Sequence, residues 1–164
     1  MTHSPMEVPG TTQFQLIDED GDELPGTWEL AWEGRDPFEV VIAAVTEVSL
    51  RPWKWSSKRA DLGRLSPRKC QALKLRVGKV LRQENRGRTA AVIARVVAEE
   101  YGLKPARRAE PGAIEAALRG AGAEDPDGHP ELLAARMLRV FRVALKAAVE
   151  VDAGLRVSWQ VGSR

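Results

Sequence analysis

The chain has 164 residues, and its hydrophobic fraction of 43% and charged fraction of 29% are typical of a globular protein, not of a disordered one. Cys70 is the single cysteine, so the fold has no internal disulfide and suits a reducing environment. The first ten residues lack the basic and apolar segments of a signal peptide. No apolar run approaches the roughly 20 residues of a membrane-spanning helix. We therefore expect a cytoplasmic protein without a membrane partner.

Positive and negative charges are separated along the chain. Residues 1–50 carry eleven acidic side chains and one arginine, a net charge of −10. Residues 51–108 carry 17 basic and four acidic side chains, a net charge of +13. Residues 109–164 carry seven basic and eight acidic side chains, a net charge of −1. This asymmetry predicts an electrostatic partner for the basic region.

Three interpretations of the basic region stay open. A nucleic acid or another polyanion binds it and releases counterions. Alternatively, it faces the acidic region, within one chain or between copies of it. The third interpretation is an ordinary solvated helix surface.

Two strands are expected near the N-terminus, over residues 14–17 and 27–32, joined by the acidic turn 18–23. In the second strand, three apolar side chains alternate with polar or small ones and share one face. The next segment, 38–48, is ambiguous. Asp36-Pro37 fits the start of a helix, yet the segment is rich in β-branched residues and its apolar positions alternate. We predict a third strand, which completes a meander.

The chain then becomes helical. Apolar residues at helical spacing predict four helices, which begin at Ser66-Pro67, Thr89, Pro111 and Pro130. Residues 155–161 alternate between apolar and polar side chains, which predicts a strand that pairs with the N-terminal sheet. Two stripes of residues are notable. The predicted core stripe of the last helix consists of Leu133, Met137, Val140, Phe141, Ala144, Ala148 and Val151. A separate cationic face of the same helix consists of Arg136, Arg139, Arg142 and Lys146.

These elements predict an α+β fold, in which a small antiparallel sheet, made of the N-terminal meander and the C-terminal strand, packs with about four helices. A flexible leader is expected over residues 1–12, and a single α+β domain over residues 13–164. The domain comprises an acidic strand region (13–50), a basic connector (51–65), a helical region (66–152) and a closing strand (155–161).

The connector and the first helix form the candidate binding region. Aromatic side chains interleaved with cations stack on bases and contact phosphates. The two tryptophans of the connector equally fit core positions, because residues two apart on a strand share a face. The candidate nucleic-acid-binding residues are Arg51, Trp53, Lys54, Trp55, Lys58, Arg59, Lys69, Arg76, Lys79 and Arg86.

Other motifs favour less specific interpretations. The second and third helices have the outline of a helix-turn-helix, but the segment from Gly102 to Pro111 is longer than the usual turn of about three or four residues. The third helix offers a single cation, Arg119. Asp18, Asp20, Asp22 and Glu23 begin like a calcium-binding loop but lack its closing glutamate and flanking helices, so we expect an acidic hairpin turn.

We expect no catalytic site, metal or cofactor. Cys70 lies on an apolar helical stripe and is predicted to be buried. His3 and His129 are the only histidines, and neither stands in a metal-ligand or nucleophile motif. No phosphate-binding glycine loop or serine nucleophile motif is found in the sequence.

Short segments resemble the start of the SsgA-like proteins of actinobacteria, which act in sporulation-specific cell division. They are Leu24-Pro25-Gly26, Arg35-Asp36-Pro37-Phe38-Glu39-Val40, a later tryptophan, and Asp61-Leu62-x-Arg64. The resemblance covers about the first third of the chain. The helical remainder departs from that family's pattern, which has more strand there, so no residue role is carried over.

These features favour a non-enzymatic binding protein, a nucleic-acid-binding accessory or regulatory factor that uses its basic helical middle region. The alternative is a structural or assembly protein, of a phage particle or a cell-division machine. In that case the acidic sheet of one copy meets the basic helices of the next, and the protein is a homo-oligomer. An enzyme of unrecognised type would need a deep polar pocket, which a sequence does not reveal.

Overall fold

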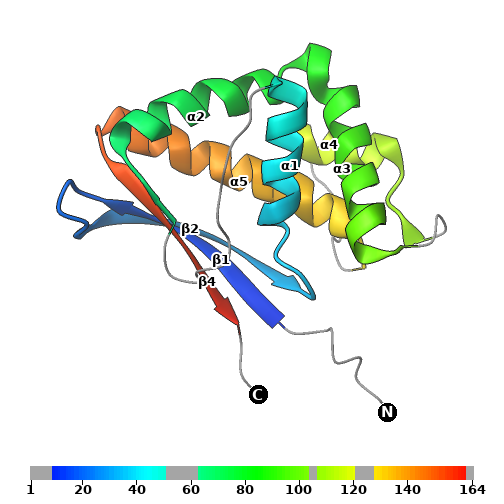
Figure 1. The fold of residues 1–164 in the computed structure, drawn as a ribbon, viewed down its shortest axis with the longest axis horizontal. Coiled ribbons are helices and arrows are strands. Elements are labelled where there is room, and N and C mark those ends of the chain that lie inside the picture. The colour runs from blue at the N-terminus through cyan, green and yellow to red at the C-terminus, as the bar shows by residue number, and fades with distance from the viewer. Residues whose placement is uncertain (1–8, 51–62, 104–106, 121–127, 162–164) are drawn as a thin grey trace. The chain divides into compact units, whose positions relative to one another are not determined.

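The computed structural model describes residues 9–50, 63–103, 107–120 and 128–161. Within these residues it shows an antiparallel four-stranded sheet and five α-helices, which confirms the predicted α+β class (Figure 1). The strands are β1 (Pro9–Ile17), β2 (Glu23–Glu33), β3 (Gly63–Leu65) and β4 (Gly154–Val161). The helices are α1 (Phe38–Ser49), α2 (Pro67–Val80), α3 (Arg86–Tyr101), α4 (Pro111–Arg119) and α5 (Pro130–Glu150), with a short 3-10 helix, η1 (Gln83–Asn85), before α3.

The described residues form two compact units. The sheet unit comprises residues 9–36, 63–74 and 143–161, and the helical unit comprises residues 37–50, 75–103, 107–120 and 128–142. The boundaries between the units fall inside α2, after Lys74, and inside α5, after Arg142. The single domain expected over residues 13–164 stays a prediction.

The strand order is β2-β1-β4-β3, so β1 and β4 form the centre of the sheet. The predicted closing strand is confirmed, because β4 pairs antiparallel with β1 from Ile17↔Gly154 to Gly10↔Val161. β1 begins at Pro9, so residues 9–12, expected in the flexible leader, are strand. β3 was not predicted, since it has three residues and no alternating pattern of useful length.

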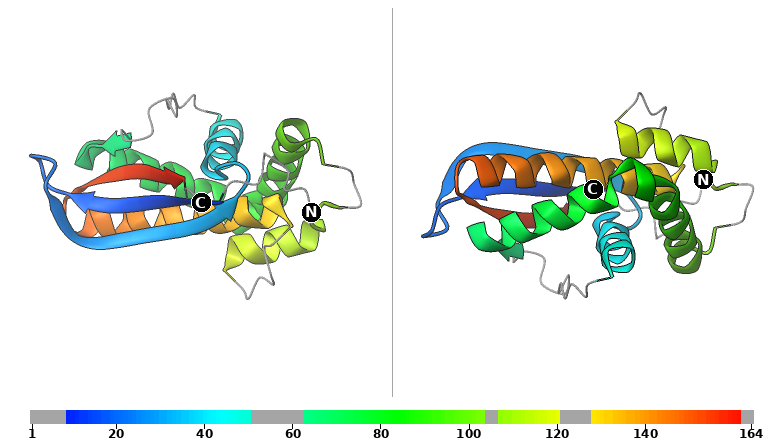
Figure 2. Two further views of the ribbon diagram at one scale, coloured as in Figure 1. Left: turned by 90° about the horizontal axis from the view of Figure 1, so that it is seen from below. Right: turned by 90° about the horizontal axis from the view of Figure 1, so that it is seen from above.

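One face of the sheet is apolar and buried. Phe14 pairs with Val157, and both side chains are fully buried. The other face is polar, with Gln13 opposite Glu29 on one side and Ser158 on the other. In Figure 2 the last turns of α5, in orange, lie alongside the sheet. This one-sided burial is typical of antiparallel sheets in α+β proteins.

The predicted third strand is wrong, because residues 38–49 form the helix α1. Its buried side chains recur at helical spacing, as Val41, Val45 and Val48 show. The ring of Phe38 meets the ring of Phe141 edge-on, with centroids 5.1 Å apart and planes at 90°. Burial of this face in the helical unit outweighs the β propensity of its valines, which depends on context.

The apolar stripes predicted for the other helices are largely buried. Val77 and Val80 of α2 and Met137 and Phe141 of α5 have no exposed surface. The assignment of Val151 to the core stripe of the last helix is wrong, because this residue lies beyond α5 and is 59% exposed. None of the described helices combines the length and the apolar character needed to cross a membrane.

Gly10 is required by the packing of Trp32. A Cβ atom at Gly10 would overlap the ring of Trp32. The indole N–H of Trp32 donates to Thr12 Oγ1 at 2.9 Å, and the Thr12 hydroxyl donates to Asp36 Oδ1 at 2.7 Å. The ring is fixed by this buried relay, so it has little freedom to move away from a larger residue.

We expect Gly10→Ala to lower the free energy of unfolding by about 1–3 kcal/mol, because the added methyl group overpacks the ring of Trp32. Gly78→Ala is the matched control. No atom lies within 4 Å of a Cβ at this α2 position, so the substitution should stabilise by about 0.5–1 kcal/mol. Urea unfolding followed by circular dichroism measures both, and equal stability of the two variants would contradict the packing described.

Candidate nucleic-acid interface

Four of the ten predicted binding residues belong to the described chain. They are Lys69, Arg76, Lys79 and Arg86. Lys69 lies in the sheet unit and the other three in the helical unit. Lys69 and Lys79 are exposed on α2. Arg51, Trp53, Lys54, Trp55, Lys58 and Arg59 lie outside the described residues, and their binding role stays a prediction.

Three cations of the helical unit contact the C-terminal end of α1. Arg76 Nη2 donates to Ser49 Oγ at 3.2 Å, and Arg88 Nη2 approaches the carbonyl oxygen of Glu47 at 3.5 Å. The Glu47 carboxylate also forms an ion pair with Arg95. The last carbonyl groups of a helix are unpaired and carry partial negative charge, which these cations offset. The structure therefore gives Arg76 a role within the protein.

Side chains fix the corner between α2 and α3. Asn85 Nδ2 donates to the carbonyl oxygen of Lys79 at 2.8 Å, and the Thr89 hydroxyl donates to that of Val80 at 2.9 Å. Both contacts satisfy carbonyl groups at the end of α2. The second helix was predicted to begin at Thr89, but this residue lies fully buried inside α3, which begins three residues earlier at Arg86. The corner thereby holds Arg86 at the first position of α3.

Arg86 belongs to an arginine cluster together with Arg139 and Arg142 of α5. Arg139 and Arg142 are three residues apart, so they lie on the same side of the helix. Burial, and then the positive charges of Arg142 and Arg86, lower the pKa of Arg139. Arg86 and Arg142 therefore contribute to the electrostatic environment of Arg139.

Arg139 lies against the end of α4. Its Nη2 atom is 2.9 Å from the position that a Cβ atom at Gly120 would occupy, and Gly120 adopts a positive φ of 77° as the C-cap of that helix. Glycine suits this position because it adopts the positive φ without strain and leaves room for the Arg139 side chain. The helix end gives the Arg139 guanidinium a defined location.

The arginine cluster has no carboxylate partner among the residues that the structure describes. The Nε atom of Arg86 is buried and makes no hydrogen bond within that part of the chain. A carboxylate nearby belongs to Glu115 of α4, whose Oε1 lies 3.5 Å from the Cβ position of Gly87. Glu115 forms no ion pair with the cluster, so three positive charges remain together.

The charge separation seen along the sequence reappears in the folded units. The described residues of the helical unit include twelve Lys or Arg and eight Asp or Glu side chains, a net charge of +4. Those of the sheet unit include seven Lys or Arg and ten Asp or Glu side chains, a net charge of −3. Seven cations of the helical unit have neither a carboxylate partner nor a side-chain hydrogen bond within the described ranges, namely Lys79, Arg82, Arg86, Arg107, Arg119, Arg139 and Arg142.

Glu131 is a buried acidic residue that the sequence did not single out. It lies in the first turn of α5 with no exposed surface, and Oε1 is 3.5 Å from Arg108 Nε. Its Oε2 approaches the backbone N–H of Ala109 at 3.5 Å. The positive end of the helix dipole favours a carboxylate here. The pair connects the segment before α4 to α5, which indicates a structural role.

We expect Arg108→Met to destabilise the protein by about 3 kcal/mol, because it leaves the Glu131 carboxylate buried without a cation. The double variant Arg108→Met/Glu131→Leu should recover most of that loss, since both charges are then absent. Chemical unfolding of the two variants at neutral pH makes the comparison. A double variant less stable than Arg108→Met would contradict this interpretation of the pair.

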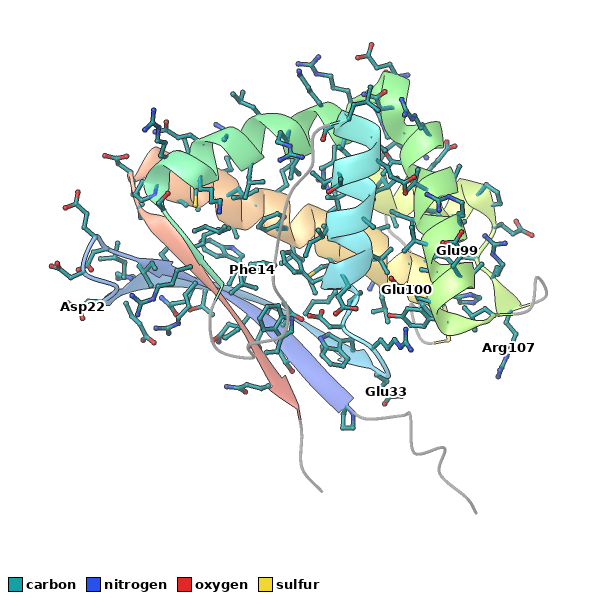
Figure 3. The ribbon with its side chains drawn as sticks, viewed as in Figure 1. Phe14, Asp22, Glu33, Glu99, Glu100 and Arg107 are labelled. Carbon is teal, nitrogen blue, oxygen red and sulfur yellow. The ribbon has the colours of Figure 1, made fainter. Side chains whose placement is uncertain are left out.

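The acidic turn between β1 and β2 is explained by its own hydrogen bonds. The carboxylates of Asp18, Asp20 and Asp22 lie within 4.8 Å of one another. Asp18 Oδ1 accepts the backbone N–H groups of Asp20 and Asp22, each at 2.9 Å. Asp22 lies at the tip of the hairpin in Figure 3. The pattern is that of an Asx turn, in agreement with the acidic hairpin expected from the sequence.

Cys70 is a buried packing residue, as the helical stripe predicted. Burial raises the pKa of the Cys70 thiol from its ordinary value of 9.0 to about 11. A thiol with this pKa is almost entirely protonated at neutral pH and is a poor nucleophile.

The raised pKa of Cys70 makes stability depend on pH. The unfolded thiol releases its proton near pH 9 and the folded thiol near pH 11, so stability falls as the pH rises between these values, by up to about 2 kcal/mol. Cys70→Ala should remove this part of the pH dependence, as measured by urea unfolding at pH 8 to 11. Identical profiles for the two proteins would contradict it.

The segment between α3 and α4 supports the expectation that the two helices are not a helix-turn-helix. α3 ends at Tyr101 and α4 begins at Pro111, a separation longer than the usual turn. Arg119 is the single cation of α4, and it follows the apolar, buried positions of that helix. The helix therefore lacks the donors that read base edges.

No known protein family, curated protein sequence or solved structure gives a significant match to this chain. The interpretation of the site therefore depends on the geometry and charge described above.

Proposed function

We propose that the protein is a non-enzymatic nucleic-acid-binding accessory or regulatory factor that acts in the cytoplasm. The observation that carries the proposal is the concentration of cations without carboxylate partners in the described helical unit. Such cations are available to neutralise phosphates and to release condensed counterions. The buried free thiol of Cys70 suits the cytoplasm.

The chemistry of the cations favours phosphate contacts over base reading. Arginine presents a planar fork of N–H donors that matches phosphate oxygens, and it is more weakly hydrated than lysine. Phosphate contacts position a protein on nucleic acid but carry no sequence information. Since α4 offers a single cation, the binding we propose is largely independent of sequence.

Lys79 and Arg82 extend the interface beyond the arginine cluster. Both are exposed at the end of α2 and precede the corner that holds Arg86. They belong to the helical unit, as the arginine cluster does. A phosphate backbone spans several such charges, which act together.

The assembly hypothesis, head-to-tail association of copies, stays a prediction. The long edge strand β2 exposes the side chains of Glu23, Glu29 and Glu33. Charged side chains on an edge strand oppose pairing with another strand. The sheet edge therefore gives that hypothesis no support beyond its negative charge.

The double variant Lys79→Gln/Arg82→Gln should weaken nucleic-acid binding about tenfold at about 50 mM salt, because two phosphate contacts are lost. The matched control is Arg95→Gln/Arg156→Gln. It removes the same charge from cations that are already paired, with Glu47 and Glu99 and with Glu23, and it should change binding less than about twofold. Fluorescence anisotropy with labelled single-stranded and duplex oligonucleotides of about 20 units provides the measurement.

Equal losses in the two double variants would show that net charge alone matters and would contradict the interface. Absence of binding to both oligonucleotides at that low salt would reject nucleic acid as the partner.

A further inference from the structure

The outer edge of the sheet is an open strand. β2 stands at one end of the strand order β2-β1-β4-β3, so it pairs with β1 on one side and with no described strand on the other. Alternate residues of such a strand direct their backbone N–H and C=O groups away from the sheet. With 11 residues, β2 is long for an edge strand, which natural proteins usually keep short. The edge therefore offers backbone donors and acceptors to another strand.

The regular part of β2 defines where another strand can pair. From Thr27 to Glu33, each residue of β2 has a partner in β1. The irregularity in the β1–β2 pairing falls before this stretch. Pro25, which also precedes it, has no N–H group to donate. The stretch available for pairing is therefore residues 27–33.

The apolar face of this stretch is incompletely covered. Trp32 is buried, whereas Trp28 and Leu30, on the same face, are only half-buried. Side chains directly opposite each other on neighbouring strands lie in contact. An added strand with apolar side chains on this face would cover the remaining surface of Trp28 and Leu30.

The solvent face of the stretch is acidic. Glu29 and Glu33 are exposed on it, and Glu33 lies at the end of β2 in Figure 3. Neither carboxylate forms an ion pair or a hydrogen bond within the described ranges, whereas Glu23 is paired with Arg156. Like charges oppose pairing with the β2 strand of a second copy. The same two charges favour a strand that carries cations on this face.

The spacing of the two glutamates specifies the pattern of such a strand. Glu29 and Glu33 are four residues apart, which corresponds to about 13 Å along a strand. The complementary strand carries cations four residues apart on one face. Its alternate residues lie on the other face and are apolar.

We infer that residues 27–33 of β2 bind an extended basic segment of a partner protein by strand addition. Main-chain hydrogen bonds supply the affinity, and the two glutamates and the apolar face select the sequence. This site belongs to the sheet unit. It goes beyond the proposed function, since nucleic acid has no part in it.

A capped heptapeptide is the probe. It carries valine at every odd position, lysine at the second and sixth positions, and threonine at the fourth. In NMR spectra of the full chain, the backbone amide resonances of residues 27–33 should shift and saturate. At saturation, the outward-facing amides among them should exchange with solvent at least about tenfold more slowly.

Two further peptides separate charge from strand pairing. The first has glutamate in place of lysine and should not bind, because its charges repel Glu29 and Glu33. The second has the original sequence with every backbone amide N-methylated. It keeps the charge but donates no main-chain hydrogen bond, so it should not bind either.

Substitutions on β2 test the role of the glutamates. Glu29→Gln/Glu33→Gln should weaken binding of the lysine peptide about tenfold, because two cross-strand ion pairs are lost. The matched control, Glu19→Gln/Glu150→Gln, removes the same charge from exposed positions of the sheet unit outside β2. It should change binding less than about twofold. Glu29→Lys/Glu33→Lys should bind the glutamate peptide and lose the lysine peptide, and circular dichroism confirms that each variant is folded.

Three results would overturn the inference. Equal weakening in the two glutamine variants would attribute binding to net charge. Undiminished binding of the N-methylated peptide would exclude strand addition. If the outward-facing β2 amides are already protected in the free protein, and light scattering gives the mass of a dimer, a second copy occupies the edge. None of these results bears on oligonucleotide binding, so this inference and the proposed function fail or stand separately.

Discussion

The described residues of the helical unit include twelve cations and eight carboxylates, so positive charge remains for a partner. Arg95 is paired with Glu47, and Arg108 with the buried Glu131. Arg76 and Arg88 are directed to the end of α1. The positive charge that remains is concentrated at the α2–α3 corner and on α5. These are the charges that the nucleic acid of our proposal would contact through its regularly spaced phosphates.

In the sheet unit, several buried polar side chains bond to one another or to the backbone. The Trp32 indole, the Thr12 hydroxyl and the Asp36 carboxylate form one relay. Gln15 donates to the carbonyl oxygen of Leu24 and accepts from Thr27, at the irregularity in the β1–β2 pairing. The net negative charge of the sheet unit disfavours contact with phosphates. These features give the sheet unit a structural role, and the binding function that we propose therefore rests on the helical unit.

Periodicity predicted most of the fold because it reports which face of an element is buried. The strict alternation in residues 155–161 predicted β4 and its pairing, and the helical stripes predicted α2 to α5. The valines of residues 38–48 led to the wrong prediction of a strand, because propensity favours a strand there whereas packing around Phe38 stabilises a helix. β3 is too short to leave a pattern in the sequence.

The candidate site was less predictable, because it depends on contacts between distant residues. The cationic face of α5 was visible from the spacing of Arg139 and Arg142, but nothing in the sequence shows that the charge of Arg86 acts on Arg139. The buried position of Glu131 was equally hidden, since an acidic residue in a first helical turn is usually exposed. The spacing of residues in the sequence shows which side chains share one face of a helix, whereas tertiary packing determines which helix faces contact one another.

The salt dependence of oligonucleotide affinity tests the central claim, that the unpaired cations of the helical unit bind phosphates. The logarithm of the association constant should fall linearly with the logarithm of salt concentration, with a slope of about −3 or steeper for the contacts described, since each phosphate contact contributes about −0.9. An affinity that does not change with salt would contradict the claim.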